Sequence, residues 1–164
     1  MCGRYSITTP PDALRRLFDF DDLPNLAPRY NLAPTQVAPV VRMKNGRCRL
    51  DSLTWGLVPA WSRDGGGGGA PLINARAETV AEKPSFRDAF ATRPCLVPAD
   101  GYYEWQAVGG GKQVMRLELT GRRPFAFAGL WECWRGDGCP RETFTIVTTA
   151  AAASIAHIHH RMPV

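Results

Sequence analysis

The chain has 164 residues, of which 45% are hydrophobic and 21% charged, and its formal net charge is +5. This length and composition are typical of one globular domain with a substantial core. No stretch approaches the ~18 apolar residues of a membrane span, and the five scattered cysteines form no CxxC pair. These features argue against a membrane protein, a zinc ribbon and a disulfide framework, and they favour a reducing, intracellular compartment.

Most of the basic residues are arginines. Arginine binds phosphate through two parallel hydrogen bonds and stacks on bases, so this bias fits nucleic-acid contact. It also fits a GC-rich genome, which the abundant alanine and glycine support independently. The charge therefore leaves nucleic-acid binding open without deciding it.

The first predicted element is a short helix that starts at Thr9-Pro10-Pro11-Asp12. The apolar residues on its buried side are Leu14, Leu17 and Phe18. Two strands follow, over Val37–Lys44 and Arg47–Val58. They flank Asn45-Gly46, a strong signal for a two-residue hairpin turn.

The remainder of the chain is predicted to form mainly strands. These strands cover Cys95–Trp105, Gln113–Thr120, Pro124–Trp134 and Glu142–Thr149. Two more short helices are expected over Ser85–Ala91, where Phe86 and Phe90 would lie together, and over Ala150–His157. The glycine run Gly65–Gly69 predicts a mobile surface loop, and no GK[ST] follows it as in a phosphate-binding loop. The predicted fold class is α+β: mostly β, with a barrel-like sheet and a few short peripheral helices.

Cys2 directly follows the initiator methionine. Because cysteine is small, we expect Met1 to be removed in cells, which leaves Cys2 with a free α-amine beside its thiol. The ordinary pKa values of these groups are about 7.7–8.0 and about 8.5, so both are substantially nucleophilic near neutrality. Such a pair condenses with an aldehyde, or serves as an N-terminal nucleophile in hydrolysis or acyl transfer. The alternative is an ordinary small apolar residue ahead of a first strand.

Glu104 lies among aromatic residues in the segment Gly101–Trp105. If its face of the predicted strand is buried, desolvation raises the pKa of this carboxyl toward the range useful for a general acid. The alternative is a solvated carboxylate on an exposed strand face.

Residues 74–79 alternate polar side chains with alanines. In a strand, Asn74, Arg76 and Glu78 would share one face. An amide that orients a substrate and an arginine that holds a phosphate are suitable components of a site. The alternative is a surface ion pair between Arg76 and Glu78 beside a helix cap.

All three histidines, His157, His159 and His160, lie near the end of the sequence. They do not have the HExxH spacing, and no carboxylate is near them in sequence, so we expect no metal site here. One histidine acting in proton transfer is the better interpretation, with the other two at the surface or in packing.

Two tryptophans, Trp55 and Trp61, flank a segment that contains glycine and proline at the end of a predicted strand. Core packing is the simplest interpretation of Trp55. An exposed Trp61 would stack on a base or wedge into a nucleic-acid strand, since stacking contributes about 1–3 kcal/mol per base.

Six short segments, taken together and in order, resemble one family, the SOS-response-associated peptidase (SRAP) family. They are MCGRY (1–5), WGLVPAW (55–61), NARAET (74–79), CLVPADGYYEW (95–105), FAGLWE (127–132) and HHRMP (159–163). Each segment alone is a weak signal, but the order of all six and the cysteine at position 2 make the resemblance specific. It runs from Cys2 to the last residue.

The resemblance implies a mostly β SRAP fold and a protein that recognises abasic sites in single-stranded DNA and links itself to them covalently. The family's catalytic residues fall on Cys2, Asn74, Glu104 and His159. Its DNA contacts fall on Arg4, Asn31, Pro34, Trp61, Arg76 and Arg161. The resemblance implies no cofactor and no metal.

The implied chemistry starts from the open-chain aldehyde of an abasic sugar. The amine of Cys2 attacks this aldehyde to give an imine, and the thiol closes a thiazolidine ring. Glu104 exchanges protons with the amine and the sugar hydroxyl, His159 assists ring opening, and Asn74 holds the amine or the sugar. An imine can also undergo β-elimination, so a weak lyase activity is implied as well.

The sequence departs from the family in one respect. Family members usually continue for several tens of residues after the HxRMP motif, whereas this sequence stops at Val164. We therefore expect a single SRAP domain over residues 1–164 that lacks its C-terminal segment.

Two other classes of function stay open. One is a cysteine-type peptidase or amidase that uses Cys2 with His159 and Asn74, and the other is a basic nucleic-acid-binding domain without catalysis. The covalent binder needs the free amine of Cys2, the peptidase needs only its thiol, and the binding domain needs neither. We expect a monomer that acts on DNA in the cytoplasm, at the nucleoid if the host is a bacterium, and not at a membrane.

Overall fold

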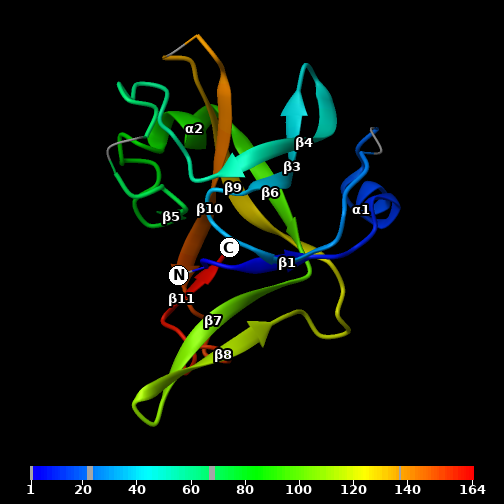
Figure 1. Ribbon diagram of the computed structural model, residues 1–164, viewed down its shortest axis with the longest axis vertical. Helices are drawn as coiled ribbons and strands as arrows, with labels where there is room; N and C mark the ends of the chain where they lie inside the picture. The colour runs from blue at the N-terminus through cyan, green and yellow to red at the C-terminus, as the bar shows by residue number, and fades with distance from the viewer. Residues whose placement is uncertain (1, 22–23, 67–68, 137) are drawn as a thin grey trace.

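The computed structural model of the chain describes residues 2–21, 24–66, 69–136 and 138–164. These residues form eleven strands and two short helices (Figure 1). In chain order the elements are β1 (Tyr5–Ile7), α1 (Pro11–Phe18), β2 (Arg29–Leu32), β3 (Val37–Lys44), β4 (Arg47–Trp55), β5 (Asn74–Arg76), α2 (Arg87–Thr92), β6 (Pro94–Ala99), β7 (Gly101–Val108), β8 (Gly111–Leu117), β9 (Phe125–Trp134), β10 (Arg141–Ala150) and β11 (Arg161–Pro163). Neither described helix is long and apolar enough to cross a membrane.

The strands form two sheets. The smaller sheet has the order β2-β1-β7-β8, and the larger has the order β11-β10-β4-β3-β6-β9, with β5 also paired to β10. β9, at one end of this strand order, also pairs with β10, so the larger sheet curls. The contact between β4 and β10 consists of only two residue pairs. The predicted mostly β, α+β fold with small helices is confirmed, whereas the sheets do not close into a true barrel.

The hairpin predicted at Asn45-Gly46 is present. β3 and β4 pair over eight residue pairs on either side of this turn. Asn45 and Gly46 have φ angles of 53° and 73°, the left-handed values that a two-residue hairpin turn requires. β4 ends at Trp55 and not at Val58, because Gly56 has a φ of 128°, which breaks the extended backbone.

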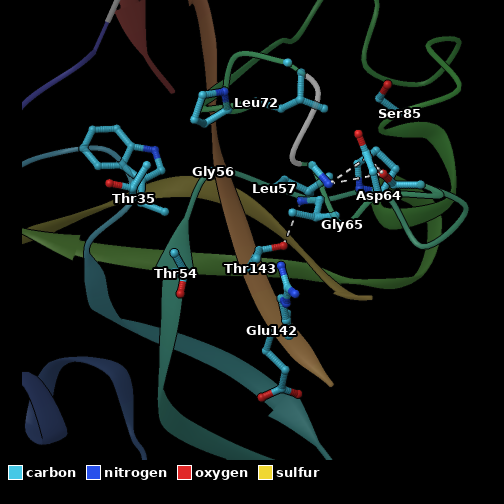
Figure 2. A pocket seen from close by; sticks show the side chains of 18 of the residues that line it. Thr35, Thr54, Gly56, Leu57, Asp64, Gly65, Leu72, Ser85, Glu142 and Thr143 are labelled. Atoms are coloured by element: carbon cyan, nitrogen blue, oxygen red, sulfur yellow. Dashed lines mark hydrogen bonds between the residues drawn. The ribbon is translucent and has the colours of Figure 1, made fainter. Parts of the chain in front are cut away.

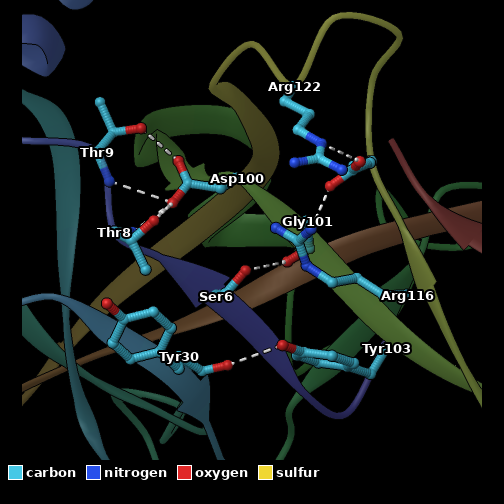
Figure 3. A network of polar contacts seen from close by, with 10 residues as sticks. Ser6, Thr8, Thr9, Tyr30, Asp100, Gly101, Tyr103, Arg116 and Arg122 are labelled. Atoms are coloured by element: carbon cyan, nitrogen blue, oxygen red, sulfur yellow. Dashed lines mark hydrogen bonds and ion pairs between the residues drawn. The ribbon is translucent and has the colours of Figure 1, made fainter.

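The segment Cys95–Trp105, predicted as one strand, is two strands in different sheets. β6 belongs to the larger sheet and β7 to the smaller, and Asp100 lies between them. The Asp100 carboxylate accepts hydrogen bonds from the backbone N–H and the hydroxyl of both Thr8 and Thr9 (Figure 3). The carboxylate therefore ties the crossing between the sheets to the end of β1.

Aromatic side chains form the centre of the core between the two sheets. Tyr5 of β1 meets Trp55 and Phe127 edge-on, with ring centroids 5.2 and 5.7 Å apart. Trp55 is fully buried, which confirms its core interpretation. Its indole N–H donates to the carbonyl of Ile73 at 2.9 Å. This bond anchors the backbone immediately before β5.

The two described helices differ in detail from the prediction. α1 buries Leu14, but Leu17 is exposed, because the helix meets the core along one narrow side only. α2 begins at Arg87, after Phe86, which packs against a small apolar cluster. The backbone N–H of Phe90 donates to the carbonyl of Phe86 at 2.7 Å, but the side chain of Phe90 is exposed, so only Phe86 packs against this cluster.

The helix predicted over Ala150–His157 is absent. β10 continues to Ala150, which pairs with Arg161 of β11. Residues 153–158 form turns that reverse the chain between these two strands. Strand pairing therefore overrides the helix propensity of the alanines. The strand predicted over Gln113–Thr120 is also shorter, since β8 ends at Leu117.

The described part of the glycine run is held in place. The amide of Gly66 donates to Ser62 Oγ and Asp64 Oδ1, at 3.3 and 3.1 Å, and Gly65 is buried. Gly67 and Gly68, which belong to the predicted mobile loop, lie outside the described residues. The start of this loop is thus packed onto the fold, whereas Gly69 at its other end is exposed.

We expect the substitution Asp100→Asn to lower the free energy of unfolding by about 1–3 kcal/mol, because an amide nitrogen cannot accept the hydrogen bonds that a carboxylate oxygen accepts. Chemical denaturation measures this change. The control is Asp88→Asn, on the exposed surface of α2, which should stay within about 0.5 kcal/mol of the wild type. Equal stability of the two variants would contradict the role given to Asp100.

Candidate active site

The beginning of the chain is packed into the smaller sheet. β1 lies between β2 and β7, and the backbone N–H of Tyr103 donates to the carbonyl of Arg4 at 2.9 Å. Cys2, two residues before Arg4, is fully buried. This pairing places Cys2 beside β7, the strand that carries Glu104.

Glu104 points to the inner side of β7. Its exposed fraction is only 3%, so the alternative of a solvated carboxylate is wrong. Tyr102 lies on the same strand face, two residues earlier, and is also buried. The charge of Glu104 acts on both Cys2 and Tyr102, so these three groups form one compact buried cluster.

Burial controls the ionisation of this cluster. It raises the pKa of the Cys2 thiol well above its ordinary value, and the charge of Glu104 raises that pKa further. Burial also raises the pKa of Tyr102 to about 12, with smaller contributions from Cys2 and Glu104. The thiol and the phenol are therefore both protonated near neutral pH. The resting form of Cys2 is a thiol and not a thiolate.

Asn74 is the first residue of β5, which runs parallel to β10. Its side-chain N–H donates to the carbonyl of Ile73 at 2.9 Å. Its Oδ1 atom is buried and accepts no hydrogen bond from the described residues. A buried acceptor without a donor is unfavourable, so this oxygen is suited to an incoming N–H or O–H group.

His159 lies in the turn before β11. The backbone N–H of Arg161 donates to its Nδ1 atom at 3.0 Å. The carbonyl of the nearby His157 accepts a hydrogen bond from the side chain of Gln106 at 3.3 Å. Because Gln106 and Glu104 share one face of β7, this bond brings the histidine segment to the Glu104 side of the strand.

The remaining histidine contributes a ring contact. His160 stacks on His159 with the ring centroids 4.4 Å apart. Within the described ranges of the chain, no three His, Cys, Asp or Glu side chains are grouped so that they could hold a metal ion.

Three of the residues predicted to contact DNA lie along β1 and β2. Arg4 donates to Asn31 Oδ1 at 3.1 Å across an exposed surface. Pro34 follows β2 and is half-buried. The hydroxyl of Tyr103 donates to the carbonyl of Tyr30 at 2.9 Å and ties β2 to β7 (Figure 3). The sheet thus presents Arg4 and Asn31 close to the buried Cys2.

Trp61 lies in a different region, on the loop after β4. Its exposed fraction is 61%, and its indole N–H donates to the carbonyl of Pro84 at 3.2 Å. The ring borders a groove of about 720 Å³, which Thr143 and Asp64 also line (Figure 2). An exposed ring beside a groove is suited to stacking on a base.

The other two predicted DNA-binding residues, Arg76 and Arg161, differ in how exposed their side chains are. Arg76 is exposed at the end of β5. Arg161 has a side chain that is only 12% exposed, and it pairs with Glu78 at 2.6 Å. The alternative pair between Arg76 and Glu78 is not formed, because β5 ends at Arg76 and the chain turns before Glu78.

Sequence reasoning missed two parts of this arrangement. Tyr102 is a member of the buried cluster, and strand alternation alone would have placed it on the face of Glu104. The Glu78–Arg161 pair joins residues 83 positions apart, and a single sequence carries no signal for it.

Known proteins are similar to this chain in sequence and in fold. A model of the SOS response associated peptidase (SRAP) family matches residues 1–164. The abasic site processing protein YoqW of Bacillus subtilis is 41% identical, over 100% of this chain and 75% of its own length. The abasic site processing protein HMCES of Gallus gallus is 30% identical, over 99% of this chain and 61% of its own length.

A solved structure extends the likeness to three dimensions. The crystal structure of a protein from Bacteroides thetaiotaomicron matches with a TM-score of 0.88 and 27% identity, over 99% of this chain and 75% of that one. With the match of the family model over every residue, the chain belongs to the SRAP family.

Proposed function

We propose that this protein binds abasic sites in single-stranded DNA and links to them covalently through Cys2 after removal of Met1, which shields the lesion. The names of its relatives, abasic site processing proteins, support the substrate class. The observation that carries the proposal is the buried thiol of Cys2 within electrostatic reach of the buried Glu104, at the start of the chain. Met1 itself lies outside the described residues.

The reaction begins at the α-amine of Cys2. The neutral nitrogen attacks the aldehyde carbon of the open sugar, and loss of one water molecule gives an imine. The thiol then adds across the C=N bond, so that sulfur bonds to carbon and the thiol proton passes to nitrogen. This step closes the thiazolidine. The high pKa of the thiol favours this order of events, because the amine is the nucleophile available first.

The neighbouring polar residues have distinct roles in this scheme. Glu104 takes a proton from the attacking amine and returns it to the hydroxyl that leaves as water. Asn74 Oδ1 accepts a hydrogen bond from the amine, which satisfies its buried oxygen. His159 assists opening of the sugar ring. Rapid closure by the thiol removes the imine before β-elimination cuts the DNA strand, so lyase activity stays weak.

The proposed contact surface for single-stranded DNA consists of the half-buried Arg4 and the exposed Arg76 and Trp61, together with Asn31 and Pro34. The two arginines bind phosphates, and the tryptophan stacks on a base or blocks a continuing duplex. Arg161 is already paired with a carboxylate, so it reaches a phosphate only after that pair opens.

The protonation of Cys2 also bears on the peptidase alternative. A cysteine peptidase attacks with a thiolate, which is formed in an electropositive and partly exposed environment. Cys2 is fully buried beside a carboxylate, and both features oppose a thiolate. The covalent DNA binder is therefore the better supported function.

Protein whose mass shows Cys2 as the first residue should form a heat-stable adduct with single-stranded DNA that contains one abasic site, visible on a denaturing gel. Cys2→Ser retains the amine but lacks the thiol, so it should give an imine that survives only after borohydride reduction. Protein that retains Met1 should give no thiazolidine. The control Cys139→Ala, at an exposed position, should behave as the wild type. Absence of an adduct with verified wild-type protein would overturn the proposal.

Alkylation by iodoacetamide should report the raised pKa of Cys2 directly. Near neutral pH, we expect the exposed Cys139 to react at least about tenfold faster than Cys2, because thiolate content and access govern this reaction. Peptide mass spectrometry measures both rates in one sample. A faster reaction at Cys2 would favour the peptidase mechanism.

The substitution Glu104→Gln should change two rates in opposite directions. Adduct formation should slow by about a hundredfold, because a general acid–base group is lost. Alkylation of Cys2 should become faster, because removal of the Glu104 charge lowers the pKa of the thiol. Affinity for DNA that carries tetrahydrofuran, an abasic analogue without an aldehyde, should be retained. Loss of that affinity would mean that Glu104 shapes the DNA groove and not the chemistry.

A further inference from the structure

The side chains of Glu78 and Arg161 form a two-pronged ion pair between the segment after β5 and the start of β11. Arg161 Nη1 donates to Glu78 Oε1 at 2.6 Å, and Nη2 donates to Oε2 at 3.0 Å. Nη2 also donates to the carbonyl and the hydroxyl oxygen of Thr148, at 2.7 and 3.2 Å. Both terminal nitrogens of the guanidinium are therefore engaged by the protein itself.

This pair has a stable charge state. The fork of Arg161 holds the pKa of Glu78 well below its usual range, at about 2, and the charge of Arg76 adds to the effect. The carboxylate is the form that makes the pair, so the pair weakens only as the pH falls through that value. Glu78 is therefore ionised, and can pair with Arg161, at any pH well above this value.

Arg161 needs such an anchor because of its place in the fold. β11 has three residues and lies at the edge of the larger sheet, paired with β10 alone. Its backbone is held there by the pairs that link Thr148–Ala150 to Arg161–Pro163. The side chain of Arg161, fixed between Glu78 and Thr148, adds a second attachment at the first residue of this short strand.

The backbone of Arg161 in turn orients His159. The Nδ1 atom of His159 lies 3.0 Å from the N–H of Arg161 and 3.1 Å from its carbonyl oxygen. The N–H donates to Nδ1 when that nitrogen is unprotonated, and the carbonyl accepts from it when it carries a proton. The backbone of Arg161 therefore holds Nδ1 in either tautomer, and Nε2 is the atom assigned to proton exchange.

We propose that Glu78 is a positioning residue for His159: through Arg161, it fixes the orientation of the imidazole that transfers the proton. This inference rests on the proposed function, in which His159 assists opening of the sugar ring.

The test compares Glu78→Gln with Glu82→Gln, an exposed carboxylate four residues further along the chain. Adduct formation at saturating abasic DNA should slow by about tenfold in Glu78→Gln, which corresponds to the loss of one oriented hydrogen bond, and should be unchanged in Glu82→Gln. Affinity for single-stranded DNA with tetrahydrofuran should be the same for both variants. Arg161→Lys, which keeps the charge but cannot make the fork, should repeat the effect of Glu78→Gln.

A double-mutant cycle separates positioning from general destabilisation. In the His159→Ala background, Glu78→Gln should cause no further slowing, because its target is gone. An equal loss in both backgrounds would overturn the inference, and so would a loss of affinity for the tetrahydrofuran DNA that matches the loss of rate.

A nitrogen-15 NMR spectrum of the imidazole tests the same inference without any adduct. His159 should give one sharp set of ring signals in the wild type and broadened or additional signals in Glu78→Gln, because the ring is then no longer held in one orientation. Unchanged ring signals in a folded Glu78→Gln variant would overturn the inference, whereas failure of the wild type to form an adduct would overturn the proposed function alone.

Discussion

The arrangement of the site depends on the point at which the chain passes from one sheet to the other. Asp100 occupies this point, and its carboxylate receives hydrogen bonds from both Thr8 and Thr9. On one side of the crossing, β6 builds the curled sheet that holds the aromatic core. On the other side, β7 pairs with β1 and carries Glu104 toward Cys2. A buried carboxylate with several donors thus couples the core of the protein to the proposed active site.

Under the proposed function, the nucleophilic thiol is held in an unreactive form. Burial and the neighbouring carboxylate both keep the Cys2 thiol protonated, and a protonated thiol is less susceptible to oxidation than an exposed thiolate. In the proposed mechanism, the thiol becomes reactive only when an imine forms beside it. The amine selects the aldehyde, and the thiol makes the bond permanent. Selectivity for an aldehyde therefore comes from the order of two steps and not from a strongly activated cysteine.

Features encoded locally were predictable from the sequence, and features that depend on distant contacts were not. The Asn45-Gly46 hairpin follows from turn chemistry, and the burial of Trp55 follows from its size. The division of Cys95–Trp105 between two sheets depends on the partners of β1, which local alternation does not reveal. The alanines after β10 have high helix propensity, yet the pairing of β10 with β11 outweighs it. The resemblance of six motifs predicted the family, whereas the Glu78–Arg161 pair could be identified only in the folded structure.

The location of Cys2 limits how such a domain can be joined to others. Its amine exists only when no residue precedes it, so a protein placed upstream in the same polypeptide would occupy the reactive nitrogen. Under the proposed function, a fusion partner or purification tag is compatible with the chemistry only downstream of the domain, unless a protease releases Cys2 afterwards. Removal of the initiator residue then acts as an irreversible maturation step, comparable to the processing of a zymogen.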